Sequence, residues 1–469
     1  MAKIQTDFKR DIIHDFARLI LQKRTRGKAP KKAVIFFRSE HINGFERDQY
    51  FVPLELLRYR KDNGRIASDV ASYEKNIAPL KEDEQETQHI LEQFLEKKDP
   101  DKTKELIENI RHSEQREPAI ITCDGFLING NRRKLALTRL YEESGGDEKY
   151  SRMRVVILPG PNDEGGTPTL KEIEQIENRY QLQSEGKAEY YKFDRALSIR
   201  RKELNGYSLE EQLRDDPLYS NLPRKNFSKE VEKYREEYLK PLECIDLYLR
   251  HLGREGLYDT ISTGISDREG RWQAFIDYYN SVEKKLSDKK KRYELGVEED
   301  EIGDIRDIAF KIIRKREFPD LPKVHVIMRK LPALLKRSDS KKALYSLKDV
   351  SLGLPNELCW ENGREIDEKK KDLKWNSENG AFLINQVKKA FHREEYESEK
   401  ETPLLLLEAS LKKLNHEDMI PTNVKVEEYS SALEYLRLIL SKAEELYQTF
   451  DNLRMLKNKT TVKNAKNYK

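Results

Sequence analysis

The segment from Pro118 to Ala136 constrains the fold most, because strand, turn and helix signals follow one another there without interruption. Ala119–Thr122 and Phe126–Ile128 are short, apolar and rich in β-branched or aromatic residues, which is typical of strands. Asn129-Gly130 is a strong turn signal, and the leucine spacing after it predicts a helix over Arg132–Tyr141. The segment therefore predicts two short strands followed by a turn and a helix.

The flanking sequence extends this segment into a compact α+β unit. Ala33–Phe37 and Met153–Leu158 are two further β-rich runs, and charged helical patterns lie between them and the central segment. Before the unit, Phe8–Lys23 has an apolar stripe and a basic face, and a basic connector, Lys23–Lys32, follows it. Such a helix either packs on its own domain or lies on a phosphate-rich or membrane surface, and the sequence leaves both readings open.

The chain changes character after a loop rich in Gly and Pro, Leu158–Pro168. Helical patterns follow at Thr169–Gln183, Lys187–Leu204, Ser208–Leu213 and Ser228–Leu252, and two of these segments begin with capping boxes. We predict a mainly α-helical C-terminal half, and we divide the 469 residues into segments 1–32, 33–165, 166–253 and 254–469, the last all-α and without an assigned role.

Composition excludes several classes of protein. Lys and Arg number 89 against 85 Asp and Glu, so a net charge of +4 does not by itself indicate a nucleic-acid-binding protein. Cys123, Cys244 and Cys359 are far apart and odd in number, which favours a reducing compartment over a disulfide framework. The longest apolar run, Pro403–Leu407, is far shorter than the ~20 residues of a membrane span. We expect a cytoplasmic protein that does not contact membranes.

The start of the Arg132–Tyr141 helix has the chemistry of an anion site. Free backbone N–H groups and the positive end of the helix dipole lie there. Gly130 permits close approach of the backbone, and Arg132 and Arg133 add donors suited to phosphate oxygens. An ordinary hairpin turn followed by a solvated first helical turn is the alternative interpretation. Arginine at a helix start opposes the dipole at a cost of about 0.3–1 kcal/mol unless an anion compensates, which favours an anion.

The order of these residues resembles the ParB/sulfiredoxin superfamily. The similar positions are Pro118, Ile120, Ile121, Asp124, Gly125, Ile128, Asn129, Gly130, Asn131, Arg132, Arg133 and Ala136, where ParB members carry Gly-Glu-Arg-Arg at the turn. Upstream, Val52–Leu57 resembles the family's opening strand and turn. Downstream, Glu177, Asn178 and Gln181 resemble its second phosphate and Mg²⁺ box.

The resemblance implies a ParB/Srx-like nucleotide-binding domain in 33–165 and a ParB-type, helix-turn-helix-like segment in 166–253. CTP or ATP is then expected at the turn, Mg²⁺ at Glu177 and Asn178, and Glu177 is the catalytic candidate if the nucleotide is hydrolysed. The nucleotide-binding candidates are Asn129, Gly130, Asn131, Arg132 and Arg133.

Two departures from the family pattern bear on catalysis. Asn131 stands where ParB proteins have Glu, which removes a carboxylate. Sulfiredoxins have their nucleophilic Cys at that position, so this chain is not expected to be one. Cys123, eight residues earlier on a predicted strand, is interpreted as a packing residue.

The helical segment supplies the DNA-binding candidates. Gly206–Leu213 resembles the first helix of the ParB helix-turn-helix, but Arg214–Phe227 is longer than the usual turn of about 3–4 residues and contains two prolines. Arg224, Lys225 and Lys229 are placed to contact DNA phosphates. Glutamates interleave with the basic residues that follow, so a solvated charged helix remains an alternative.

Near the C-terminus, apolar residues recur at spacings of three and four: Leu433, Leu436, Leu440, Ala443, Tyr447 and Phe450. This seam predicts a homodimer, and an intramolecular helix hairpin would explain it equally well. The function we expect is nucleotide-dependent DNA binding with CTP or ATP and Mg²⁺. Two alternatives remain, an enzyme of the same fold (a nuclease or a kinase-like phosphotransferase) acting in phage defence or a mobile element, and a non-catalytic adaptor.

Overall fold

The structure is a computed structural model that describes residues 10–27, 31–35, 37–38, 45–182, 192–261, 270–362, 364–417 and 419–466. The chain divides into two compact units, Met1–Glu394 and Glu395–Lys469. The first unit contains a small sheet with helices and then a helical region, so the prediction of an α+β chain with a helical C-terminal half is confirmed.

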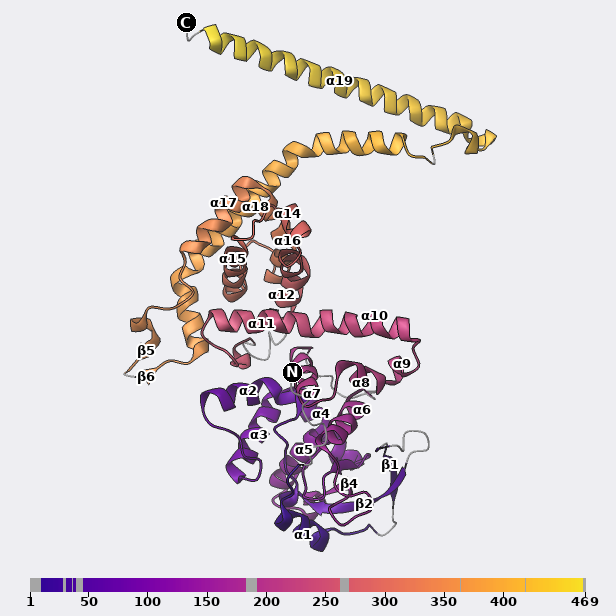
Figure 1. Ribbon diagram of the computed structural model, residues 1–469, viewed down its shortest axis with the longest axis vertical. Coiled ribbons are helices and arrows are strands. Elements are labelled where there is room, and N and C mark those ends of the chain that lie inside the picture. Colours follow the sequence, from indigo (N-terminus) through magenta and orange to yellow (C-terminus); the bar gives the residue numbers. More distant parts are fainter. Residues whose placement is uncertain are drawn as a thin grey trace. The chain divides into compact units, whose positions relative to one another are not determined.

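A four-stranded sheet forms the centre of the N-terminal region (Figure 1). Its strands are β1 (Lys32–Ile35), β2 (Phe45–Pro53), β3 (Ala119–Ile121) and β4 (Arg152–Ile157), in the order β1-β2-β4-β3. The β1–β2 and β2–β4 pairs are antiparallel, and β3 runs parallel to β4.

Three of the four expected strands are present as β1, β3 and β4, with ends shifted by one or two residues. The expected strand at Phe126–Ile128 makes only isolated bridges, through Phe126 to Arg58 and through Leu127 to Ile121. β2 extends well before the Val52–Leu57 segment in which an opening strand was expected.

Alternate side chains of the sheet enter two separate cores, as the period of a strand requires. Ala119, Ile121, Met153 and Val155 face a core that includes residues of α1 (His14–Lys23), α2 (Ala67–Asn76), α3 (Gln85–Lys97), α4 (Pro100–Ser113) and α5 (Asn131–Glu143). Ile120 and Val156 face a smaller core that α6 (Leu170–Leu182) closes with Ile173 and Ile176. The sheet therefore has helices on both of its faces, and α5 packs on the face of the larger core.

Where the structure describes them, the expected helices are present. The amphipathic helix begins at His14, and Phe8 lies outside the described residues, as do residues 28–30 of the basic connector. The helices expected at Thr169–Gln183 and Lys187–Leu204 are described as α6 and α7 (Lys192–Leu204), and 183–191 lie outside the described residues. Both capping boxes are confirmed, at Thr169 with Glu172 and at Ser208 with Glu211.

The helical region continues with α8 (Leu209–Arg214), α9 (Pro217–Ser220), α10 (Arg224–Tyr234) and α11 (Lys240–His251). One turn of π-helix, Arg235–Leu239, joins α10 to α11, and together they form one long rod (Figure 1). The remaining helices of the first unit are α12 (Gly270–Tyr278), α13 (Lys284–Leu286), α14 (Lys289–Glu294), α15 (Ile302–Lys315), α16 (Val324–Lys336), α17 (Ser338–Tyr345) and the first part of α18 (Glu368–Leu414). A short hairpin of β5 (Trp360–Glu361) and β6 (Arg364–Glu365) precedes α18, and α19 (Tyr429–Lys466) ends the chain.

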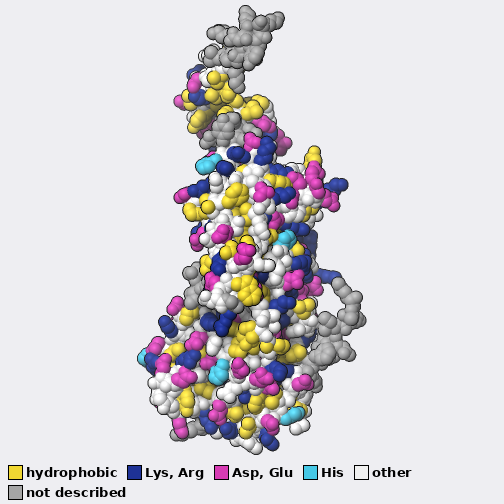
Figure 2. Space-filling model, turned by 90° about the vertical axis from the view of Figure 1, so that its left-hand side faces the viewer, with side chains coloured by type: hydrophobic (Ala, Val, Ile, Leu, Met, Phe, Trp, Pro, Cys, Tyr) yellow, Lys and Arg dark blue, Asp and Glu magenta, His cyan; other side chains and the backbone are white. Residues whose placement is uncertain are grey.

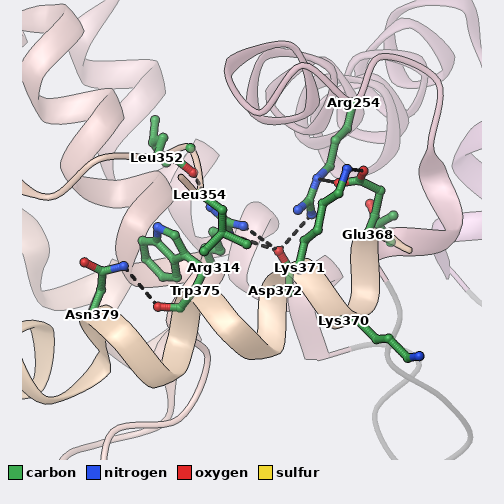
Figure 3. A network of polar contacts seen from close by, with 12 residues as sticks. Arg254, Arg314, Leu352, Leu354, Glu368, Lys370, Lys371, Asp372, Trp375 and Asn379 are labelled. Carbon is green, nitrogen blue, oxygen red and sulfur yellow. Dashed lines mark hydrogen bonds and ion pairs between the residues drawn. The ribbon is translucent and has the colours of Figure 1, made fainter. Parts of the chain in front are cut away.

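One apolar core joins these helices from Phe193 to Ala390, so it runs across the segment boundary placed at residues 253 and 254. A buried ion network accompanies it, in which Asp372 of α18 lies 2.8 Å from Arg254 and 2.9 Å from Arg314 (Figure 3). Arg271 lies 3.2 Å from the same carboxylate. Burial alone would raise the pKa of Asp372, but the three arginines together hold it below its usual value. The network ties the loop that follows α11 to α12, α15 and α18.

None of the helices in the described part of the chain is long and apolar enough to cross a membrane.

Candidate functional site: a cavity at the start of helix α5

A cavity of about 680 Å³ opens at the N-terminus of α5. Its walls come from the predicted turn, from α4 and the loop after it, and from α6, α7, α8 and α10. The cavity brings all five nucleotide-binding candidates together with Glu177 and Asn178. Its size lies within the roughly 300–1,000 Å³ of small-molecule sites.

Packing against β3 shapes the turn. The Asn129 side chain accepts a hydrogen bond from the Ile120 backbone N–H at 2.7 Å, so its oxygen is occupied by the sheet. Gly130 has φ +86°, and a Cβ there would lie 2.7 Å from the Cβ of Ala119. A glycine is thus required by the fold at this position, whether or not a ligand approaches. Helix α5 then begins with no side-chain cap and no acidic residue in its first turn.

The two arginines of the turn both have protein partners. Arg132 forms an ion pair with Asp99, and Arg133 donates a hydrogen bond to the Glu117 carbonyl. Burial lowers the pKa of Arg133, although a guanidinium group remains charged at neutral pH. An anion bound at this helix start would compete with Asp99 for Arg132, while the backbone N–H groups and the dipole favour the anion.

Three polar atoms that belong to cavity-lining residues are buried and have no hydrogen-bond partner among the described residues. They are Asn63 Nδ2, Asn131 Oδ1 and Ser198 Oγ, on residues that are 4%, 9% and 2% exposed. The Asn63 oxygen accepts from the Arg65 backbone N–H at 3.0 Å, which fixes the orientation of that amide. Buried polar groups normally find a partner. These three atoms are themselves buried, so a ligand or a water in the cavity would reach them only after a side-chain rearrangement.

Glu177 lies in a buried ion network. Its carboxylate is 3.4 Å from the Arg60 guanidinium and accepts from the Gly64 N–H at 3.4 Å, and Arg60 is also 3.6 Å from Glu174. Burial disfavours the charge of Arg60, but the two carboxylates raise its pKa above the usual value. The geometry therefore gives Glu177 a structural partner in addition to its place on the cavity wall.

Asn178 uses both atoms of its amide. Its nitrogen donates to the Gln212 carbonyl at 3.1 Å, and its oxygen accepts from the Lys202 ammonium at 3.2 Å. In the described part of the chain, no group of three or more His, Cys, Asp or Glu side chains is placed to hold a metal ion. A Mg²⁺ ion at Glu177 and Asn178 would thus have one carboxylate, already paired with Arg60, and an amide oxygen already bonded to Lys202.

Helix α7 supplies cavity residues that the sequence analysis missed. Arg195, Ser198 and Lys202 line the cavity, and Lys202 is 2% exposed, so burial lowers the pKa of its ammonium group. Arg195 also donates to the Tyr234 hydroxyl of α10 at 3.1 Å. Their spacing of three and four residues, which places them on one face of the helix, was the signal in the sequence.

The three DNA-binding candidates lie together at the start of α10. Arg224, Lys225 and Lys229 are exposed, and none pairs with an acidic residue among those described. Of the glutamates that interleave with the basic residues, Glu230 pairs with Lys233 of the same helix at 3.5 Å. On the face drawn in Figure 2, by contrast, acidic and basic side chains are mixed throughout.

The geometry at Cys123 agrees with a packing role. The residue is half-buried, and burial together with the neighbouring Asp124 raises the pKa of its thiol to about 11. A thiol with that pKa is almost entirely protonated at neutral pH and is a poor nucleophile.

Fold and site together define a mixed α+β protein with a polar cavity between a helix N-terminus and a helical region. Neither a protein-family model nor a curated protein nor a solved structure matches the chain.

Proposed function

We propose that the cavity binds a nucleoside triphosphate, CTP or ATP, and that this binding controls the contact of α10 with DNA, as in a ParB-like protein. The triphosphate would lie at the start of α5, with the N–H groups of the turn and the Arg132 and Arg133 side chains as donors.

One observation carries the proposal: the cavity wall includes both the turn of the α+β region and Tyr234, in the last turn of the helix that begins with Arg224. Arg195 links this helix to α7 through the Tyr234 hydroxyl. A ligand that fills the cavity therefore touches the helix that carries the DNA-binding candidates. Cations at a helix N-terminus oppose its dipole, so the start of α10 is stabilised by bound phosphate.

Mg²⁺ would enter with the triphosphate, because this ion is usually held by phosphate oxygens, waters and one or two carboxylates. Glu177 is the carboxylate available for it, in competition with Arg60. The same competition, and Asn131 in place of a Glu, favour a protein that binds the nucleotide as a signal and hydrolyses it slowly or not at all. Such a non-catalytic protein is our second candidate, and in either form we place the protein in the cytoplasm.

A thermal-shift screen with the four ribonucleoside triphosphates, with and without Mg²⁺, tests nucleotide binding. A ligand at about 100 times its Kd adds about 2.7 kcal/mol to the stability of the state that it binds. That free energy corresponds to about 3 °C if a unit of roughly 390 residues unfolds as a whole. We expect CTP or ATP to give a shift of this size.

Arg132→Ala should remove most of the shift. It should also lower the melting temperature without nucleotide, because Asp99 loses a largely buried ion pair, and removing a cation from a helix start regains only about 0.3–1 kcal/mol. Arg111→Ala is the matched control, since Arg111 is an exposed arginine of α4 that pairs with Glu108 and Glu143. A shift of wild-type size in Arg132→Ala, or no shift with any triphosphate, would show that the turn is only scaffold.

A further inference from the structure

The C-terminal unit, Glu395–Lys469, exposes many large apolar side chains. The end of α18, the segment that follows it, and α19 as far as Met455 have large apolar side chains that are exposed. Those more than a third exposed are Leu404, Leu406, Leu407, Leu411, Leu414, Met419, Ile420, Val426, Tyr429, Leu433, Tyr435, Leu436, Leu438, Ile439, Leu440, Tyr447, Phe450, Leu453 and Met455. A patch of this kind on a protein marks an interaction surface.

Most of these residues on α19 lie on one stripe. The stripe has three apolar positions that each repeat every seven residues between Tyr429 and Leu453. The first position holds Tyr429, Leu436, Ala443 and Phe450, the second holds Ala432, Ile439, Leu446 and Leu453, and the third holds Leu433, Leu440 and Tyr447. Three apolar positions in each heptad make a face wider than the two-position seam of a two-stranded coiled coil. A face of this width packs against two neighbouring helices.

The end of α18 carries a narrower stripe of the same kind. Leu404, Leu407, Leu411 and Leu414 follow one another at spacings of three, four and three, and they are 70%, 40%, 60% and 38% exposed. One chain thus offers two amphipathic helices, and its own α18 stripe is too narrow to cover the whole face of α19.

We propose that a second copy of this chain covers these faces, and that the two C-terminal units form a four-helix bundle in a homodimer. Each copy supplies two helices, so each α19 has two helices to pack against in the bundle. A twofold axis relates the two copies, so no further copy can add to the assembly.

The area available fits this occupant. A large aliphatic side chain has roughly 60–120 Å² of apolar surface to bury. The twelve large stripe residues, each about half exposed, then offer roughly 400–800 Å² per chain. Two copies reach about 800–1,600 Å², which overlaps the roughly 1,200–2,000 Å² of specific interfaces even before other atoms of the helices are included.

Sedimentation velocity of the full chain at about 50 µM, well above a micromolar dissociation constant, tests the proposal. We expect a mass twice the 55.4 kDa of one chain. Leu436→Asp with Leu440→Asp should give the single-chain mass with an unchanged circular dichroism spectrum, because both residues are already exposed within one chain, at 48% and 68%. A monomeric wild-type chain would overturn the proposal. The stripe would then bind a different protein and not a second copy of this chain.

Leu438→Asp is the matched control. Leu438 is 61% exposed and lies on the opposite side of α19 from the stripe, so its replacement should leave the dimer intact. Leu411→Asp tests the bundle itself and should weaken the dimer at least tenfold, since α18 contributes to the core. A Leu411→Asp dimer of wild-type affinity, or a Leu438→Asp chain as monomeric as the double variant, would contradict the four-helix arrangement.

Discussion

Glu177→Gln separates the structural role of this residue from a role in binding a metal. The change removes the charge that faces Arg60 at 3.4 Å but keeps an oxygen that accepts from the Gly64 N–H. Breaking a buried ion pair costs about 3–5 kcal/mol, because the remaining charge has no compensation. Glu174 stays 3.6 Å from Arg60 and compensates in part, so we expect a loss of about 2–3 kcal/mol.

Thermal unfolding followed by circular dichroism should show this loss as a fall in melting temperature of about 3 °C if the whole first unit unfolds together, and of about 4–12 °C if the α+β region unfolds alone. Glu96→Gln is the control, since Glu96 is exposed and pairs with Arg139, and it should change stability by less than about 0.5 kcal/mol. An unchanged stability in Glu177→Gln would refute the structural role. If Glu177 also serves Mg²⁺, the variant loses the Mg²⁺-dependent part of the nucleotide-induced shift as well.

Three further predictions concern buried charge and the thiol. Asp372→Asn should destabilise the helical region by about 3–5 kcal/mol by urea unfolding, because three buried arginines lose their carboxylate, whereas Asp339→Asn on the surface should be nearly neutral. Since the pKa of Asp372 is held low in the folded state, this difference should be full above about pH 4 and should shrink as the pH falls below the folded pKa. Burial lowers the pKa of Lys134 to about 8, so the stability of the protein should rise as the pH increases from about 8 to 10.5. Lys134→Met should remove that rise. At pH 7 it should stabilise the protein by up to about 3 kcal/mol, less the contribution of the cation–π contact between Lys134 and Tyr59. Cys123 should react with iodoacetamide at pH 7 many times more slowly than an unperturbed thiol, and alkylation at the rate of free cysteine would contradict the packing role.

Local sequence signals were sufficient for the elements around the cavity. The strand Ala119–Ile121, the turn at Gly130 and the helix from Asn131 follow from apolar periodicity and turn chemistry, and both capping boxes follow from residue spacing. The second strand, Phe45–Pro53, was not foreseen over most of its length. It mixes Arg, Asp and Gln with aromatic residues, and its strand conformation depends on pairing with β1 and β4.

The cavity residues were only partly predictable for a related reason. The turn could be predicted from its own residues, whereas Glu177 and Asn178 were singled out only through the resemblance to the ParB/sulfiredoxin superfamily. The Arg60 partner of Glu177 and the Lys202 partner of Asn178 come from distant positions, so only the fold reveals that these side chains are already occupied. Spacing left a homodimer and an intramolecular hairpin open for the C-terminal seam, and the exposure of its apolar side chains is the observation behind our dimer proposal.

The most direct test of nucleotide-dependent DNA binding is the affinity for a labelled DNA duplex, measured by fluorescence anisotropy at constant salt with and without the triphosphate that stabilises the protein most. We predict that the nucleotide changes the Kd at least tenfold, that Arg132→Ala abolishes this change, and that Arg224→Ala weakens binding about equally with every duplex sequence, as loss of a phosphate contact does. An equal Kd with and without nucleotide, or no binding of duplex DNA even at low salt, would contradict the account.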